Sequence, residues 1–179
     1  MPFEKINSTT TNNAQDYSGS NNHGTVTSAT WNVSGGYDEK GAYEFDGLND
    51  YIEISNIDFS GDITAEAWIK ADSLTSTRII SRSEWCESSD RGWAPFEFIL
   101  LSNGKLRYMM TETSDCGGGW SQDRYETDTA VIDAEKWYHV VVSVDDNSEE
   151  SRSVTFYVNG NEVANTHDDQ TAPFTQSGN

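Results

Sequence analysis

The chain has few cysteines, prolines, histidines and basic residues: 2 Cys, 3 Pro, 3 His, and 11 Lys and Arg against 30 Asp and Glu. The shortage of cations argues against nucleic acids and anionic membrane surfaces as partners, because both are bound by neutralising phosphate. No apolar run approaches the ~20 residues of a membrane-spanning helix, so we expect no direct membrane insertion. Two isolated cysteines lack the spacing of a zinc site.

The acidic residues give a formal net charge of −19 and are spread along the chain rather than gathered in a tail. One interpretation is a solvated, mutually repelling surface that keeps the protein in solution. The other is adaptation to high salt, which screens repulsion between carboxylates. Both remain open. The length suits one domain over residues 1–179, in which we expect a polar N-terminal segment at 1–15 and a polar, truncated tail at 167–179.

Period-2 alternation of apolar residues, separated by turn signals, dominates the chain and predicts an all-β, antiparallel β-sandwich. Asn103-Gly104 and Asn159-Gly160 are strong hairpin signals. An edge strand at 3–6 and a single turn at 133–136 are further expectations. The predicted strands are 24–31, 42–45, 51–54, 63–70, 78–83, 96–101, 106–110, 129–132, 137–144, 154–158 and 162–166.

The same alternation assigns the two faces of the predicted strands. The expected core set is Ile63, Ala65, Ala67, Ile69, Tyr138, Val140, Val142, Val144, Val154, Phe156 and Val158. The opposite face then carries Trp68, Trp137, His139 and Tyr157. Aromatic rings on such a face can stack on sugar C–H groups. The alternative is a second packing layer beneath long loops.

Cys86 and Cys116 flank the hairpin predicted at Asn103-Gly104. Folding the chain about that turn brings both cysteines to the open end of the hairpin, where a disulfide is geometrically reasonable. The alternative is a pair of free thiols in a reducing compartment.

Three tryptophans surround these cysteines, and an exposed tryptophan in a pinned loop suggests a contact surface. The candidate ligand-binding residues are Trp85, Trp93, Trp120, Arg91, Arg124 and Tyr125, together with Trp68 on the sheet. Carbohydrate is the first candidate, because indole stacks on a sugar ring while Arg hydrogen-bonds its hydroxyls. A protein partner is the second, and a small satellite cluster of packed loops is the third.

Five motifs occur in a characteristic order. The first two are Asp16-Tyr-Ser-Gly-Ser-Asn-Asn-His-Gly and Gly41-Ala-Tyr-Glu-Phe-Asp-Gly-Leu-Asn-Asp-Tyr-Ile-Glu-Ile. The others are Ala65-Glu-Ala-Trp-Ile-Lys, Lys136-Trp-Tyr-His-Val-Val-Val, and a hairpin through Asn159-Gly160. In this order the chain resembles the laminin-G-like, concanavalin A-like lectin/glucanase jelly-roll family over residues 16–163.

The resemblance implies a concanavalin-like jelly roll with a structural Ca²⁺ near the start motif. Oxygen ligands suit this ion, and the implied metal residues are Asp16, Asn21 and His23, with Asp46 and Asp50 as nearby candidates. Asp16 as a plain turn cap is the competing reading. We expect the family's closing strands to be absent after Val163, and in the family the acidic one often completes the calcium site.

Catalysis finds no support in the sequence. A retaining glycosidase needs two carboxyl groups ~5 Å apart, and the nearest pattern, Glu44-Phe-Asp46, lies in the turn motif. Met1–Lys5 has neither the basic n-region nor the apolar h-region of a signal peptide, whereas the Thr-, Ser- and Asn-rich composition is typical of extracellular proteins. We therefore expect a non-catalytic, extracellular or cell-surface binding module of a longer protein, directed at a glycan. A protein-binding adhesion domain is the alternative, and a polysaccharide-degrading enzyme comes third.

Overall fold

The computed structural model describes residues 13–55, 57, 61–86, 91–112, 121–145 and 152–171, with no side-chain description at 83–86, 91–95, 112, 121 and 169–171. Every regular element among these residues is a β-strand, which confirms the all-β prediction. The chain divides into two compact units, Met1–Asp58 (unit 1) and Phe59–Asn179 (unit 2). That both belong to one domain stays a prediction.

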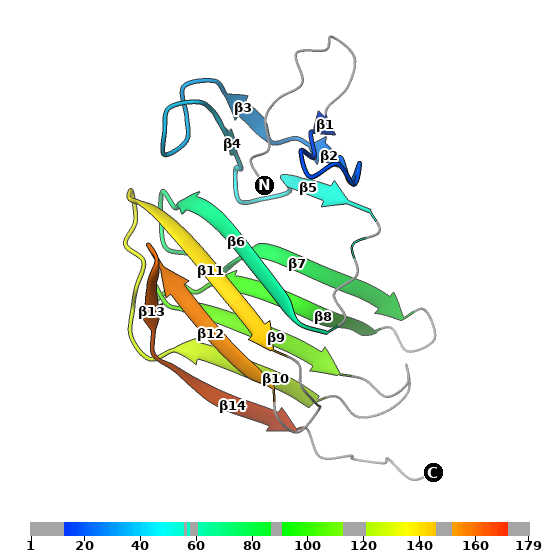
Figure 1. Ribbon diagram of the computed structural model, residues 1–179, viewed down its shortest axis with the longest axis vertical. Coiled ribbons are helices and arrows are strands. Elements are labelled where there is room, and N and C mark those ends of the chain that lie inside the picture. The colour runs from blue at the N-terminus through cyan, green and yellow to red at the C-terminus, as the bar shows by residue number, and fades with distance from the viewer. Residues whose placement is uncertain are drawn as a thin grey trace. The chain divides into compact units, whose positions relative to one another are not determined.

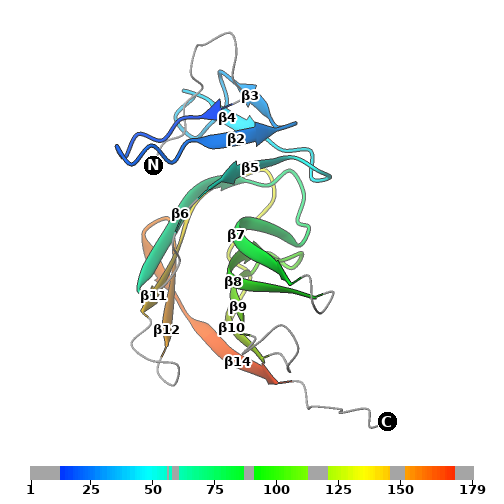
Figure 2. The same ribbon diagram turned by 90° about the vertical axis from the view of Figure 1, so that its right-hand side faces the viewer.

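Unit 2 contains two antiparallel sheets that form two facing layers, seen edge-on in Figure 2. The five-stranded sheet has the order β14 (Asn165–Thr171), β10 (Ser121–Thr127), β9 (Leu106–Glu112), β8 (Arg91–Leu100) and β7 (Thr77–Cys86). The four-stranded sheet has the order β13 (Asn161–Val163), β12 (Ser153–Val158), β11 (Trp137–Asp145) and β6 (Ile63–Lys70), and Figure 1 labels these strands.

The core of unit 2 lies between these layers, and alternation correctly identified its contribution from the four-stranded sheet. Val140, Val142 and Phe156 are fully buried, as the period-2 pattern predicts. Phe156 faces Phe98 of the other sheet, with ring centroids 6.2 Å apart. Non-directional burial of such rings supplies most of the stability of a sandwich.

Two predicted hairpin turns are present, each with backbone that favours Gly or Asn. Asn159 and Gly160 both have positive φ, 51° and 77°, as a type I′ turn between β12 and β13 requires. Gly104 has φ 78° and closes a three-residue loop in which Leu101 and Lys105 are hydrogen-bonded. The Gly104 carbonyl also accepts hydrogen bonds from the amides of Val131 and Ile132.

That contact explains why the predicted strand at 129–132 is wrong. These residues are irregular, and Ile132 is buried as a plug against the hairpin turn rather than as part of a ladder. The apolar residues Val131 and Ile132 resemble a short strand in sequence although they form none.

The sequence reading also missed β10 (Ser121–Thr127), since only Tyr125 is a large apolar residue in it. Residues 167–171, expected in a polar tail, instead belong to β14, which pairs with β10 from Ser121↔Thr171 to Thr127↔Asn165. Polar side chains on both strands concealed the pairing.

Unit 1 contains a three-stranded sheet, β1 (Asn13–Ala14), β2 (Gly24–Thr27) and β5 (Tyr51–Ile54), and a two-stranded ribbon, β3 (Thr30–Asn32) with β4 (Ala42–Glu44). The strand predicted at 24–31 is broken into β2 and β3 at Ser28, which has φ 62°. The patterns at 42–45 and 51–54 are both strands, but they belong to different sheets. Trp31 packs edge-on against Tyr43, with ring centroids 4.9 Å apart.

In the part of the chain that the structure describes, no helix has the length and apolar character needed to cross a membrane. The edge strand predicted at 3–6 lies outside the described residues.

Candidate binding surface

The outer face of the four-stranded sheet carries the aromatic residues that alternation placed there. In the β6–β11 register, Trp68 lies opposite His139 and Trp137 opposite Lys70. Tyr157 follows on β12, opposite Val141. We call the surface formed by Trp68, Trp137, His139 and Tyr157 the aromatic face.

Trp68 is the most exposed residue described on the aromatic face, with 47% of its surface accessible, and it lies on the edge strand β6. Its indole lies beside the His139 ring, with centroids 5.3 Å apart and planes inclined by 38°. His139 also contacts Glu66, whose Oε2 lies 3.2 Å from His139 Nε2. The indole therefore has the His139 ring as a neighbour, while about half of the Trp68 surface is in solvent.

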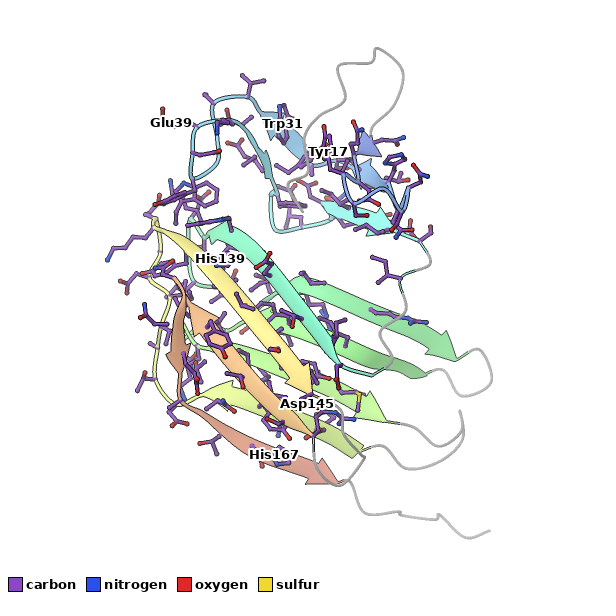
Figure 3. The ribbon with its side chains drawn as sticks, in the orientation of Figure 1. Tyr17, Trp31, Glu39, His139, Asp145 and His167 are labelled. Atoms are coloured by element: carbon purple, nitrogen blue, oxygen red, sulfur yellow. The ribbon has the colours of Figure 1, made fainter. Side chains whose placement is uncertain are left out.

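The β12–β13 hairpin turn holds the backbone of His139, whose ring lies beside Trp68. The amide of His139 donates to Asn159 Oδ1 at 2.9 Å, while the Asn159 amide donates to the His139 carbonyl at 2.8 Å. Figure 3 shows His139 on β11. A reciprocal bond pair of this kind holds the strand rigid, which a stacking platform requires.

The charges near the aromatic face are mainly negative. Glu66 and Glu162 are exposed, and Glu162 lies opposite Tyr157 in the β12–β13 register. Lys70 is paired with Glu135 at 3.4 Å.

Two of the other sequence-predicted ligand residues, Arg124 and Tyr125, are not brought together. Arg124 and Tyr125 are adjacent on β10 and therefore face opposite sides of the five-stranded sheet. The Arg124 guanidinium pairs with Asp168 at 3.1 Å, whereas Tyr125 is buried and donates from its hydroxyl to the Arg152 carbonyl at 2.9 Å. Tyr125 thus lies in the core.

The tryptophan cluster around the cysteines is outside the description. Trp85 and Cys86 lie in β7, and Arg91 and Trp93 in β8, but their side chains are not described; Trp120 and Cys116 are outside the described residues. The disulfide and the tryptophan contact surface therefore stay predictions.

Asp16 has the geometry of a buried turn cap. Its Oδ1 accepts the Ser18 amide at 2.7 Å, and its Oδ2 accepts the Asn22 amide and the Ser18 hydroxyl, both at 2.9 Å. These hydrogen bonds, Ser18 first, lower the pKa of the Asp16 carboxyl below its usual value. His23 Nδ1 accepts the Asp16 amide at 3.0 Å.

The predicted calcium residues fall into two groups at opposite ends of β5. The Asp16 loop leads into Gly24, which pairs with Ile54 at the end of β5, whereas Asp50 precedes the first residue, Tyr51. Asp50 Oδ2 accepts the Asp46 amide, which caps that turn.

Among the described residues no three His, Cys, Asp or Glu side chains gather in a possible metal site. Asp16 supplies one carboxylate of the six to eight oxygens that Ca²⁺ takes. Calcium at the Asp16 loop thus stays a prediction.

Two features were not expected from the sequence. Asp123 on β10 binds both Arg152 and His167, and the His167 ring stacks on Tyr125 at 4.2 Å, which ties β14 and the start of β12 to β10. A shallow groove of about 260 Å³ lies near the end of β10, lined by Lys105, Glu126, Thr127, Asp128, Thr166 and Asp168. The missed β14 concealed both.

Comparison with known proteins supports the fold. A family model described as the concanavalin A-like lectin/glucanases superfamily matches residues 45–179. This range includes all the strands of unit 2 and β5 of unit 1. No curated protein and no solved structure matches the chain.

Proposed function

The chain belongs to the concanavalin A-like lectin/glucanases superfamily, and from this premise we propose that it is a non-catalytic module that binds carbohydrate on its aromatic face. The observation that carries the proposal is the half-exposed indole of Trp68 on a rigid sheet. A flat indole offers its face to sugar C–H groups, while neighbouring polar groups hydrogen-bond hydroxyls. We further propose an extracellular or cell-surface setting, on the Thr-, Ser- and Asn-rich composition.

The geometry of Glu44 and Asp46, the nearest match in the sequence to a catalytic carboxylate pair, favours a binding module over an enzyme. Glu44 accepts a hydrogen bond from the Asn32 amide group at 2.7 Å. Asp46 Oδ1 accepts the Leu48 amide at 2.8 Å. Both carboxylates thus hold local structure rather than face each other across a cleft. Absence of turnover on polysaccharides that the protein retains checks this part of the proposal.

The test is retention on a polysaccharide panel by affinity electrophoresis. Trp68→Ala should weaken retention about tenfold or more, since removing a large aromatic contact costs ~1–2 kcal/mol or more. Tyr37→Ala is the matched control, because Tyr37 is an aromatic residue that is 62% exposed and does not belong to the aromatic face; the retention of this variant should equal that of the native chain. Circular dichroism verifies that both variants fold.

Unchanged retention of Trp68→Ala would remove the aromatic face from the proposal. Retention lost instead in Trp85→Ala, Trp93→Ala or Trp120→Ala would move the site to the tryptophan cluster.

A protein-binding adhesion module is the second candidate, because exposed aromatic residues also dominate protein interfaces. Silence across the polysaccharide panel, together with Trp68-dependent capture of a defined protein partner, would favour it.

A further inference from the structure

We infer that the ligand of the aromatic face is a cationic saccharide, an oligomer of amino sugars. This inference rests on the proposed function and goes further by assigning the charge class of the ligand. It follows from which side chains share the face, how they are spaced, and which charges among them are already neutralised.

The first step is the composition of the face. Alternation and register place on it Thr64, Glu66, Trp68 and Lys70 of β6, Trp137, His139, Val141 and Ser143 of β11, Thr155 and Tyr157 of β12, and Glu162 of β13. The ammonium of Lys70 is paired with Glu135, so it adds little positive potential. Glu66 and Glu162 are the exposed carboxylates of the face, and Glu66 Oε2 already lies 3.2 Å from His139 Nε2.

The second step is spacing. The registers align Glu66, Val141, Tyr157 and Glu162 in one row across four strands. Adjacent strands lie ~4.8 Å apart, so the two carboxylates end a row of roughly 14 Å. The Trp68–His139 pair forms the next row. This length exceeds one monosaccharide and suits an oligosaccharide with charged groups on more than one ring.

The third step is electrostatics. A protonated sugar amine beside Trp68 gains a cation–π contact with the indole face and an ion pair with Glu66. A sulfated or uronic saccharide would meet these carboxylates and the −19 net charge of the chain, which disfavours its approach. A neutral saccharide keeps the stacking contact but gains nothing from the acids.

The experiment measures the affinity of the native chain for four oligosaccharides of equal length by calorimetry, at a pH where the sugar amine is protonated. These are a glucosamine oligomer, its N-acetylated counterpart, a neutral glucan and a sulfated oligomer. We expect the glucosamine oligomer to bind about tenfold more tightly than the acetylated one, the difference of one charge-assisted contact, and the sulfated oligomer not to bind.

Variants separate a built site from general attraction of a cation to an acidic protein. Glu66→Gln should remove most of the amine preference while leaving affinity for the acetylated oligomer. Trp68→Ala should weaken both oligomers. Glu53→Gln removes an equal charge from an exposed position on β5 and should change neither affinity.

Equal affinity for the amine and acetylated oligomers would overturn the inference and leave the proposed function standing. Equal losses in Glu66→Gln and Glu53→Gln would also overturn it, because the preference would then come from overall charge. Failure of all four oligosaccharides to bind would instead contradict the proposed function itself.

Discussion

Thr127 lies in the core at the end of β10, where a single hydroxyl joins three segments. The side chain is fully buried; its Oγ1 accepts the Leu106 amide at 3.1 Å and donates to the Thr129 carbonyl at 3.0 Å. Period-2 alternation alone cannot distinguish this residue from a solvent-facing threonine. Thr127 belongs to β10, and a strand with a single large apolar residue shows no pattern from which its buried face could be recognised.

Replacing this hydroxyl with a methyl group tests its role. Thr127→Val should lower the free energy of unfolding by about 1–3 kcal/mol, because the buried Leu106 amide and Thr129 carbonyl lose their partner. Thr155→Val, on the outer face of β12, should change stability by about 0.5 kcal/mol or less. Urea unfolding measures both. Equal effects at the two positions would show that the Thr127 hydrogen bonds contribute nothing.

At the scale of elements, the sequence was most informative where one face of a strand is strongly apolar. β6, β11 and β12 match their predicted ranges and faces within a residue or two, because burial against the facing sheet requires the period-2 pattern. β10 and β14 were missed or displaced, because their residues are mostly polar and the two strands are joined by polar pairs such as Arg124 with Asp168. For the candidate site, the alternation pattern correctly assigned the residues of the aromatic face to the outer side of the sheet. The pattern could not show that Tyr125 is buried, because the rings that pack against it come from β9 and β14.

Two glycine turns offer a matched prediction at this scale. Gly104 and Gly160 have nearly equal φ, 78° and 77°. A Cβ on Gly104 would lie 2.5 Å from the Ile132 carbonyl oxygen, whereas one on Gly160 meets nothing within 4 Å. Gly160→Ala should therefore cost about 1–2 kcal/mol for the left-handed backbone, and Gly104→Ala clearly more. Thermal melting of both variants checks this order, and equal costs would mean that the 131–132 segment moves aside freely.

For the whole molecule, the 30 acidic residues make ionic strength a strong variable. Screening shortens the range of repulsion from ~30 Å at 0.01 M salt to ~10 Å at 0.1 M. We expect the Tm at neutral pH to rise by several degrees over this range, with NaCl and KCl equivalent, and the rise to shrink near pH ~4 as carboxyls become neutral. A Tm that falls with salt would show that ion pairs outweigh repulsion.

Acid also removes stability, because some ionised carboxylates are held by hydrogen bonds or ion pairs that protonation breaks. Asp16 has a lowered pKa for the reasons given above. Burial acts to raise the pKa of Glu126, but hydrogen bonds from Arg107 and Lys105 outweigh it and lower the pKa overall. A depressed folded-state pKa gives stability that is complete above the unfolded-state value of ~4 and is lost as pH falls through the folded-state value. Melting curves should therefore keep this contribution down to pH ~5 and lose it below pH ~4, and Asp16→Asn should flatten that loss.

β14 forms one margin of the five-stranded sheet, and its sequence, Asn-Thr-His-Asp-Asp-Gln-Thr, contains two adjacent aspartates. A margin strand offers its free amides and carbonyls to any extended peptide, which is how sheets of separate molecules fuse into polymers. Each approaching copy would bring two further aspartates beside these two, of which Asp168 is already paired with Arg124. The polarity of β14, which hides this strand from sequence analysis, should therefore also disfavour the addition of further strands at this edge of the sheet.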